Sequence, residues 1–236
     1  MNFTFIREML LQMSPALRNT LLITFLSAGL GWLLAIGIAL VRVKRIRILS
    51  NVCAVYVSLM RSVPLVIIMF FTYYAVPQII AYYRYEQGLS VASVAGNTSL
   101  LCPVAAMSLS EAAFASEVFR SALEAVPHGQ MEAAHSVGMT SLQAYLRIVF
   151  PQAVVIALPN MGGLFIGLLK SSTLAYYSGV VEITGYAYTL ASPTYQFLEA
   201  FFVISVLYEL LSFLFSRIFS CLEQNFGKYR KGVISV

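Results

Sequence analysis

The sequence predicts an all-helical protein that crosses a membrane several times. Of its 236 residues, 59% are hydrophobic and 11% are charged, and the mean hydropathy of +0.81 exceeds that of soluble domains. The hydrophobic residues form runs of about 20 residues, the length that crosses a bilayer as a helix. We expect one transmembrane domain over residues 1–236 with five spans. These cover residues 21–41, 51–74, 98–119, 152–172 and 197–219.

The first span, residues 21–41, contains no charged residue. A helix of this length covers about 31 Å, enough for the hydrocarbon core. Four cations follow directly: Arg42, Lys44, Arg45 and Arg47. Because cytoplasmic loops carry an excess of Lys and Arg, we expect this loop inside and the N-terminus outside.

The second span, residues 51–74, is interrupted by Arg61 and Pro64. It leads into a tyrosine-rich segment that is typical of an outer membrane interface. The connection over residues 81–97 is expected outside. The third span, residues 98–119, then returns the chain to the cytoplasm.

The fourth span, residues 152–172, contains prolines and glycines that let it bend and pack closely. Residues 175–196 hold no Lys or Arg and are expected to form an outer loop. The fifth span, residues 197–219, leads into a basic tail with Lys228, Arg230 and Lys231. The charge pattern therefore predicts an N-out, C-in topology.

A short amphipathic helix is expected between the third and fourth spans, over residues 128–138. Pro127 suits the first helical turn, and Gly138 suits the end, where a left-handed conformation costs glycine little. The apolar residues of the helix recur three positions apart: Met131, Ala134 and Val137. At this length the helix is too short to cross a bilayer.

Glu132-Ala133-Ala134, Gly138, Ile148 and Pro151 follow the spacing EAA-x3-G-x9-I-x2-P. This pattern resembles the EAA motif of bacterial ABC importer permeases. The resemblance implies the type I ABC importer fold, with the short helix as the cytoplasmic coupling helix that docks on an ATPase. The docking residues that it implies are Gly129, Glu132, Ala133, Ala134 and Gly138. Without the resemblance, the same residues also fit an ordinary interfacial helix.

Three further segments resemble motifs of the polar amino acid permeases within that family. Residues 61–65 are similar to RGTPL, residues 170–174 to KDTSL, and residues 181–184 to PELT. The resemblance implies substrate contacts in residues 170–174, and we expect further contacts at residues 61–64, where a charge and a helix start lie within the membrane. The candidate residues are Arg61, Ser62, Val63, Pro64, Ser171, Ser172, Thr173 and Leu174.

A charged side chain within the membrane costs free energy and needs a partner or a water-filled cavity. Arg61 and a helix that starts at Pro64 suit a substrate carboxylate, but Arg61 also fits a structural pair with Glu111 or Glu209. The hydroxyls of residues 171–173 fit the polar atoms of a small zwitterion, or bonds back onto their own helix. Both alternatives stay open at the level of sequence.

Catalysis by this chain finds no support in the sequence. It contains no Asp and no phosphate-binding loop, and its two histidines, His128 and His135, make a poor metal site. Glu117 and Arg120, three apart, predict a surface ion pair. We expect no cofactor and no metal, because the resemblance places ATP on a partner.

The resemblance implies a set of partners in a bacterial cell membrane. These are two copies of an ABC ATPase, a second permease subunit that is this chain or a homologue, and an external solute-binding protein. Alternatives of another class are a secondary carrier, which predicts internal inverted repeats that we do not find, and a structural membrane protein.

Ser171 stands where KDTSL sequences have an acid, which favours a substrate without net positive charge. Desolvating a cationic side chain without a carboxylate partner would be costly. Cystine, glutamine or glutamate would fit. The alternative is a permease for basic amino acids or opines whose selectivity is set by a sister subunit.

Overall fold

The computed structural model describes residues 2–89 and 100–234, with side chains described as far as residue 227. Part of the predicted 81–97 connection, the first residues of the third span and the side chains of the basic tail lie outside the described residues. The α-helices are α1 (Phe3–Gln12), α2 (Ser14–Val43), α3 (Arg47–Ser62), α4 (Leu65–Glu86), α5 (Leu101–Glu124), α6 (His128–Ser136), α7 (Ser141–Ala144), α8 (Phe150–Ser171), α9 (Ile183–Ala191) and α10 (Phe197–Ile234). A π-helix, η1 (Tyr145–Val149), precedes α8, and a 3-10 helix, η2 (Ser172–Ser178), follows it.

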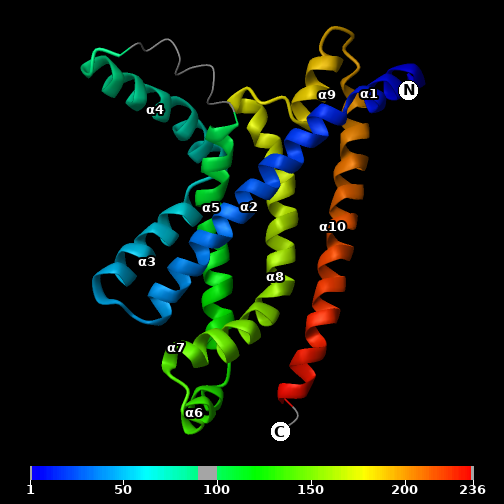
Figure 1. Ribbon diagram of the computed structural model, residues 1–236. Coiled ribbons are helices and arrows are strands. Elements are labelled where there is room, and N and C mark those ends of the chain that lie inside the picture. The colour runs from blue at the N-terminus through cyan, green and yellow to red at the C-terminus, as the bar shows by residue number, and fades with distance from the viewer. Residues whose placement is uncertain (1, 90–99, 235–236) are drawn as a thin grey trace.

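Helix α5 lies at the centre of the bundle and packs against α2, α3, α4 and α8, while α10 lies beside α8 (Figure 1). Helix α2 runs diagonally across α5 and α8. Helices α2 and α5 approach closely at Gly31, where an added Cβ would lie 3.0 Å from Cβ of Glu111. Small residues at such a seam let two backbones pack in contact, which is how helices associate in lipid.

The predicted second span is in fact two helices, α3 and α4, with a break between them. Val63 has extended backbone angles, φ −89° and ψ 129°, as expected for a residue before proline. Pro64 cannot continue α3, because its ring clashes with the preceding turn. Helix α4 then runs twelve residues past the predicted end at residue 74, to Glu86, and takes in most of the tyrosine-rich segment.

Among the described residues, four segments are long and apolar enough to cross a membrane: 14–43, 65–86, 141–178 and 197–227. They confirm an all-helical protein with several apolar spans. The 24-residue α5 matches the predicted third span in place, but serines, three glutamates and one arginine make it less apolar. Five crossings and the N-out orientation stay predictions.

The predicted outer loop over residues 175–196 folds largely into η2 and α9, which is a correction. Gly179 reverses the chain with φ +75°. Glu182 then caps α9 by accepting the N–H groups of Thr184 at 2.9 Å and Gly185 at 2.7 Å. A lack of Lys and Arg is a basis for predicting topology, and it does not predict local structure.

Helix α1 is an additional element that the sequence did not predict. Phe5 and Met9 are buried in a cluster with residues of α9 and α10, such as Ile183 and Tyr208. Helix α1 is therefore anchored to the same end of the bundle as α9 (Figure 1).

Candidate functional site

Helix α6 lies at one end of the bundle, between the ends of α5 and α8 (Figure 1). It begins one residue after Pro127, which occupies the cap position. Gly138 has φ +79°; its N–H donates to His135 O at 3.0 Å, and Met139 N–H donates to Ala134 O at 3.1 Å. This pair of bonds is the Schellman ending that requires a left-handed residue. The predicted role of Gly138 as a helix terminator is confirmed.

The two faces of α6 divide the predicted docking residues. Gly129, Glu132 and Ala133 are exposed, as is Gly138. Ala134 is only 1% exposed. Ala134 therefore faces the bundle in this subunit, and the docking role of all five residues stays a prediction.

The predicted apolar face of α6 is narrower than its spacing suggested. Met131 packs against a buried cluster formed by α2, α5 and α8, but Val137 is 73% exposed. The reason is that Val137 is the cap residue, with φ −94° and ψ 14°, where the helix unwinds before Gly138. Helical periodicity no longer applies to its side chain.

Further large apolar side chains are exposed along α6, α7 and η1, and sequence reasoning missed them. Val137 is joined by Leu142, which is 66% exposed, and Leu146, which is 61% exposed. Together with Gly129, Glu132, Ala133 and Gly138, these residues form a candidate interface, which we call the docking surface. Exposed apolar groups rimmed by polar ones are typical of a protein interface. In the sequence these three residues are recognisable only as apolar residues, and they lie outside the EAA spacing.

The last two residues of the EAA pattern lie at the π-helix. Phe150 N–H donates to Tyr145 O, five residues back. Pro151 has no N–H to give, and in a regular α-helix its ring would clash with the carbonyl of Arg147. The wider π turn accommodates it. Ile148 and Pro151 therefore belong to the joint through which the docking surface continues into α8.

The second predicted site begins at the break between α3 and α4. Arg61, Ser62, Val63 and Pro64 are all exposed, and α4 starts directly after Pro64 as predicted. The Arg61 guanidinium lies 5.4 Å from the centre of the Phe114 ring, a cation–π contact.

The predicted pairing of Arg61 with Glu111 does not occur in this structure. The Glu111 carboxylate accepts the indole N–H of Trp32 at 2.9 Å, across the seam between α5 and α2. The other predicted partner, Glu209, is exposed on α10. The sequence indicates only that each glutamate lies within an apolar span. It does not indicate which helix face each one occupies.

The predicted strip over residues 170–174 spans the change from α8 to η2. Lys170 is exposed, and Ser171, Thr173 and Leu174 are half-buried. Ser172 is fully buried and donates to Leu169 O at 2.7 Å. Of the two alternatives for these hydroxyls, Ser172 forms the bond back onto its own helix.

The structure brings the two predicted substrate segments together through their apolar ends. Leu65, directly after Pro64, and Leu174 pack against the same buried cluster, which includes Ile68 and Met69. Helix η2 also contacts α4 and α5. The half-buried Thr173 therefore belongs to an element that packs directly against α4, and Ser171 is the last residue of α8, directly before that element.

Known proteins are similar to this chain over nearly its whole length. The L-cystine transport system permease protein TcyL of Bacillus subtilis (strain 168) is 34% identical over 217 residues, covering 92% of this chain and 88% of the relative. The nopaline transport system permease protein NocM of Agrobacterium fabrum is 34% identical over 218 residues, covering 92% and 89%.

Solved structures agree with these relatives. A crystal structure of an amino acid ABC transporter with histidines matches with a TM-score of 0.79 and 27% identity, covering 95% of this chain and 99% of that one. An inward-facing structure of the MetNI methionine ABC transporter shares the fold, with a TM-score of 0.72 at 18% identity and coverage of 93% and 98%.

These relatives confirm the resemblance to amino acid ABC importer permeases that the motifs predicted. Residues 27–228 also match a family described as the inner membrane component of binding-protein-dependent transport systems. That family, and the apolar helices 14–43, 65–86, 141–178 and 197–227, make the chain a multi-pass protein of the bacterial plasma membrane. The chain belongs to the family of binding-protein-dependent transport system inner membrane components.

Proposed function

We propose that this chain is the transmembrane subunit of an ATP-driven amino acid importer, coupled through α6 to a separate ATPase. One observation carries the coupling role. The docking surface presents Gly129, Glu132 and Ala133 beside exposed apolar side chains, and the left-handed Gly138 fixes its end. The names of the relatives, which include cystine and nopaline transport permeases, support the substrate class.

In this mechanism α6 transmits movement because it is held to the bundle on one face and free on the other. Ala134 and Met131 anchor it to the core that α2, α5 and α8 share. Closure of two ATPase subunits on ATP would draw two such helices together. The spans attached to them would then switch a central cavity, formed with a second permease subunit, from inward-facing to outward-facing.

The substrate we propose is a neutral or weakly anionic polar amino acid such as cystine, glutamine or glutamate. Arg61 is exposed beside the start of α4, where free N–H groups and the helix dipole favour a carboxylate. Ser171 and Thr173 are half-buried hydroxyls on the neighbouring strip, with no acid in the KDTSL-like segment. A cationic side chain would lack a partner there.

A second candidate is the import of basic amino acids or opines, with selectivity set by a sister subunit. It is favoured by relatives named as nopaline and octopine transport permeases, at 34% identity. In that case the sister chain would supply the acid that Ser171 replaces.

Copurification and uptake test the proposal. The chain is expected to copurify with an ABC ATPase. The reconstituted complex, supplied with its solute-binding protein on one side of the membrane, is expected to import labelled amino acids only when ATP is present on the side that carries the ATPase. Uptake without any ATPase would point to a secondary carrier and overturn the proposal. A panel of cystine, glutamine, glutamate, arginine and nopaline separates the two substrate classes.

A further inference from the structure

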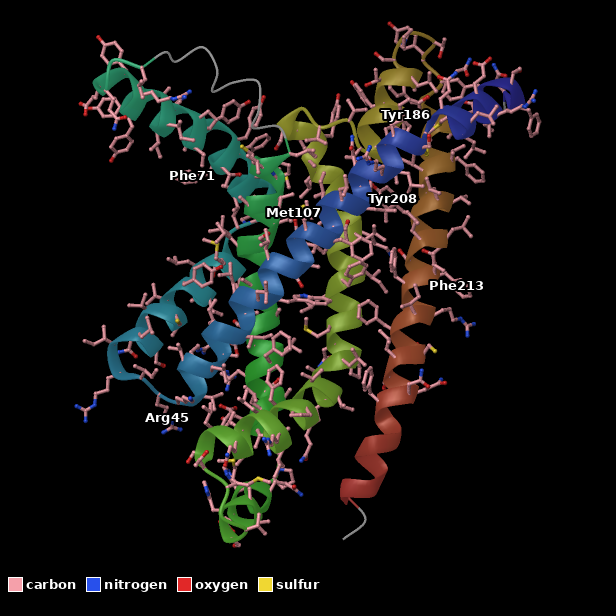
Figure 2. All side chains as sticks on the ribbon, viewed as in Figure 1. Arg45, Phe71, Met107, Tyr186, Tyr208 and Phe213 are labelled. Atoms are coloured by element: carbon pink, nitrogen blue, oxygen red, sulfur yellow. The ribbon has the colours of Figure 1, made fainter. Side chains whose placement is uncertain are left out.

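The last turn of α2 touches the chain on both sides of α6. We call residues 125–149, which join α5 to α8, the coupling segment. Arg42 pairs with Glu117 on α5, ahead of the segment. Lys44 Nζ lies 5.7 Å from the centre of the Tyr145 ring, at the start of η1. Figure 2 shows Arg45 in the turn that follows, at the end of the molecule where α6 lies.

Glu117 is the shared acceptor of two arginines from two helices. One carboxylate oxygen pairs with Arg42 of α2, and the other accepts Nε of Arg120 at 2.9 Å. Arg120 also pairs with Glu124 at 2.7 Å. The predicted Glu117–Arg120 pair is therefore confirmed within a larger network. The side chains of Arg42, Glu117 and Arg120 are 20–30% exposed, so water screens them only in part.

The end of α2 is itself fixed by an unusual backbone. Arg45 has φ +49°; its N–H donates to Arg42 O, and Ile46 N–H donates to Val41 O. This is a Schellman ending with a non-glycine residue in the left-handed position, which disfavours L side chains. It ends the helix at the turn that carries Arg42 and Lys44.

Apolar packing joins the same elements beneath these charges. Val43 from α2, Phe119 from α5, Met131 from α6 and Tyr145 from η1 contact one buried cluster. The coupling segment is covalently continuous with α5 and α8, so its movement reaches those helices through the chain. Helix α2 receives that movement only through non-covalent contacts.

We infer that Glu117 is the positioning residue through which the coupling segment moves α2, with Arg42 and Lys44 acting as a clamp across both ends of the segment. The inference rests on the proposed function, because it needs an ATPase bound at α6. Loss of the clamp leaves α5 and α8 responsive to ATP and removes the response of residues 36–46, the end of α2 near α6.

Hydrogen exchange on the intact permease–ATPase complex tests this directly. Exchange is compared without nucleotide and after trapping with ATP and vanadate. In the wild-type complex, residues 36–46 and 125–149 are both expected to respond to nucleotide. In Glu117→Gln, residues 125–149 keep their response and residues 36–46 lose it. A merely structural role would raise exchange over 36–46 in both states and keep the response.

Matched variants sharpen the result. Arg42→Gln is expected to copy Glu117→Gln, and the double variant to add little, because both remove one interaction. Arg47→Gln removes a charge from the same basic loop outside the network and is the control. Uptake per ATP hydrolysed is expected to fall at least about fivefold in Glu117→Gln, the lower end of common coupling factors, and less in Glu117→Asp.

The outcomes separate the inference from the function beneath it. Glu117→Gln with a wild-type nucleotide response over 36–46 and an unchanged coupling ratio would overturn the clamp. A wild-type complex in which residues 125–149 ignore nucleotide would overturn the proposed function itself, and the inference with it. Binding of the ATPase and thermal stability are measured alongside, so that a misfolded variant is recognised and replaced by Glu117→Asp.

Discussion

The phenol of Tyr208 on α10 donates a hydrogen bond of 3.1 Å to the carboxylate of Glu182, the residue that caps α9. Both side chains are buried, and Figure 2 shows Tyr208 on the part of α10 near α9. Thr20 of α2 joins the same junction by accepting the N–H of Ile183 at 3.2 Å. The Glu182 carboxylate thus joins α9 to α10, and the Thr20 hydroxyl joins α9 to α2.

The first prediction is that Tyr208→Phe destabilises the protein by about 1 kcal/mol, because it removes one hydrogen bond and leaves the buried carboxylate short of a donor. Thermal unfolding of the detergent-solubilised protein measures the loss. Tyr195→Phe is the matched control, since Tyr195 is 84% exposed. A variant as stable as the wild type would show that the bond contributes nothing.

A second prediction concerns the end of α6. Gly138→Val places a β-branched side chain at φ +79°, a conformation it resists. We expect loss of ATPase binding or of substrate-stimulated hydrolysis, with membrane insertion unchanged. Gly138→Asn should retain much of the activity, because asparagine tolerates left-handed angles. Normal coupling in Gly138→Val would refute the role of this helix end.

The third prediction is the orientation in the membrane. In a background without Cys53, Cys102 and Cys221, an impermeant thiol reagent on spheroplasts should label Ser192→Cys and spare Arg45→Cys until the membrane is opened. Both positions are exposed, whereas Glu182 is buried and unsuitable as a reporter. The reverse pattern of labelling would invert the topology.

A fourth prediction addresses selectivity. Ser171→Asp restores an acid to the KDTSL-like strip and should shift uptake toward basic amino acids such as arginine, because a carboxylate can then pair with the substrate cation. Competition for uptake by arginine and glutamine, before and after the change, measures the shift. Stronger competition by arginine in the unaltered complex would contradict the proposed neutral substrate.

The helices whose signals are local could be predicted from the sequence. The uncharged run at residues 21–41 lies inside α2, and Gly138 ends α6, because length, charge and glycine conformation act within a few residues. The break at Pro64 was visible for the same reason. Its consequence, two separate helices in place of one interrupted span, depended on packing against α5.

Features that depend on contacts between distant helices could not be predicted. Glu117 pairs with Arg42, 75 residues away in the sequence, and Glu111 bonds to Trp32 instead of Arg61. Helix α9 depends on a cap by Glu182 that α2 and α10 support. In each case the sequence supplies the groups, and only the fold decides which of them meet.

Trp32 is the single tryptophan of the chain, and its indole N–H donates to the Glu111 carboxylate beside Gly31, where α2 and α5 pack closely. The protein therefore carries an intrinsic fluorophore at one defined helix contact. Its emission reports on the surroundings of that contact without any label, and these surroundings include the Phe165 ring of α8, whose centre lies 6.3 Å from that of Trp32. Sliding of α2 along α5 during a transport cycle would change the spectrum, because it would part the indole from its acceptor.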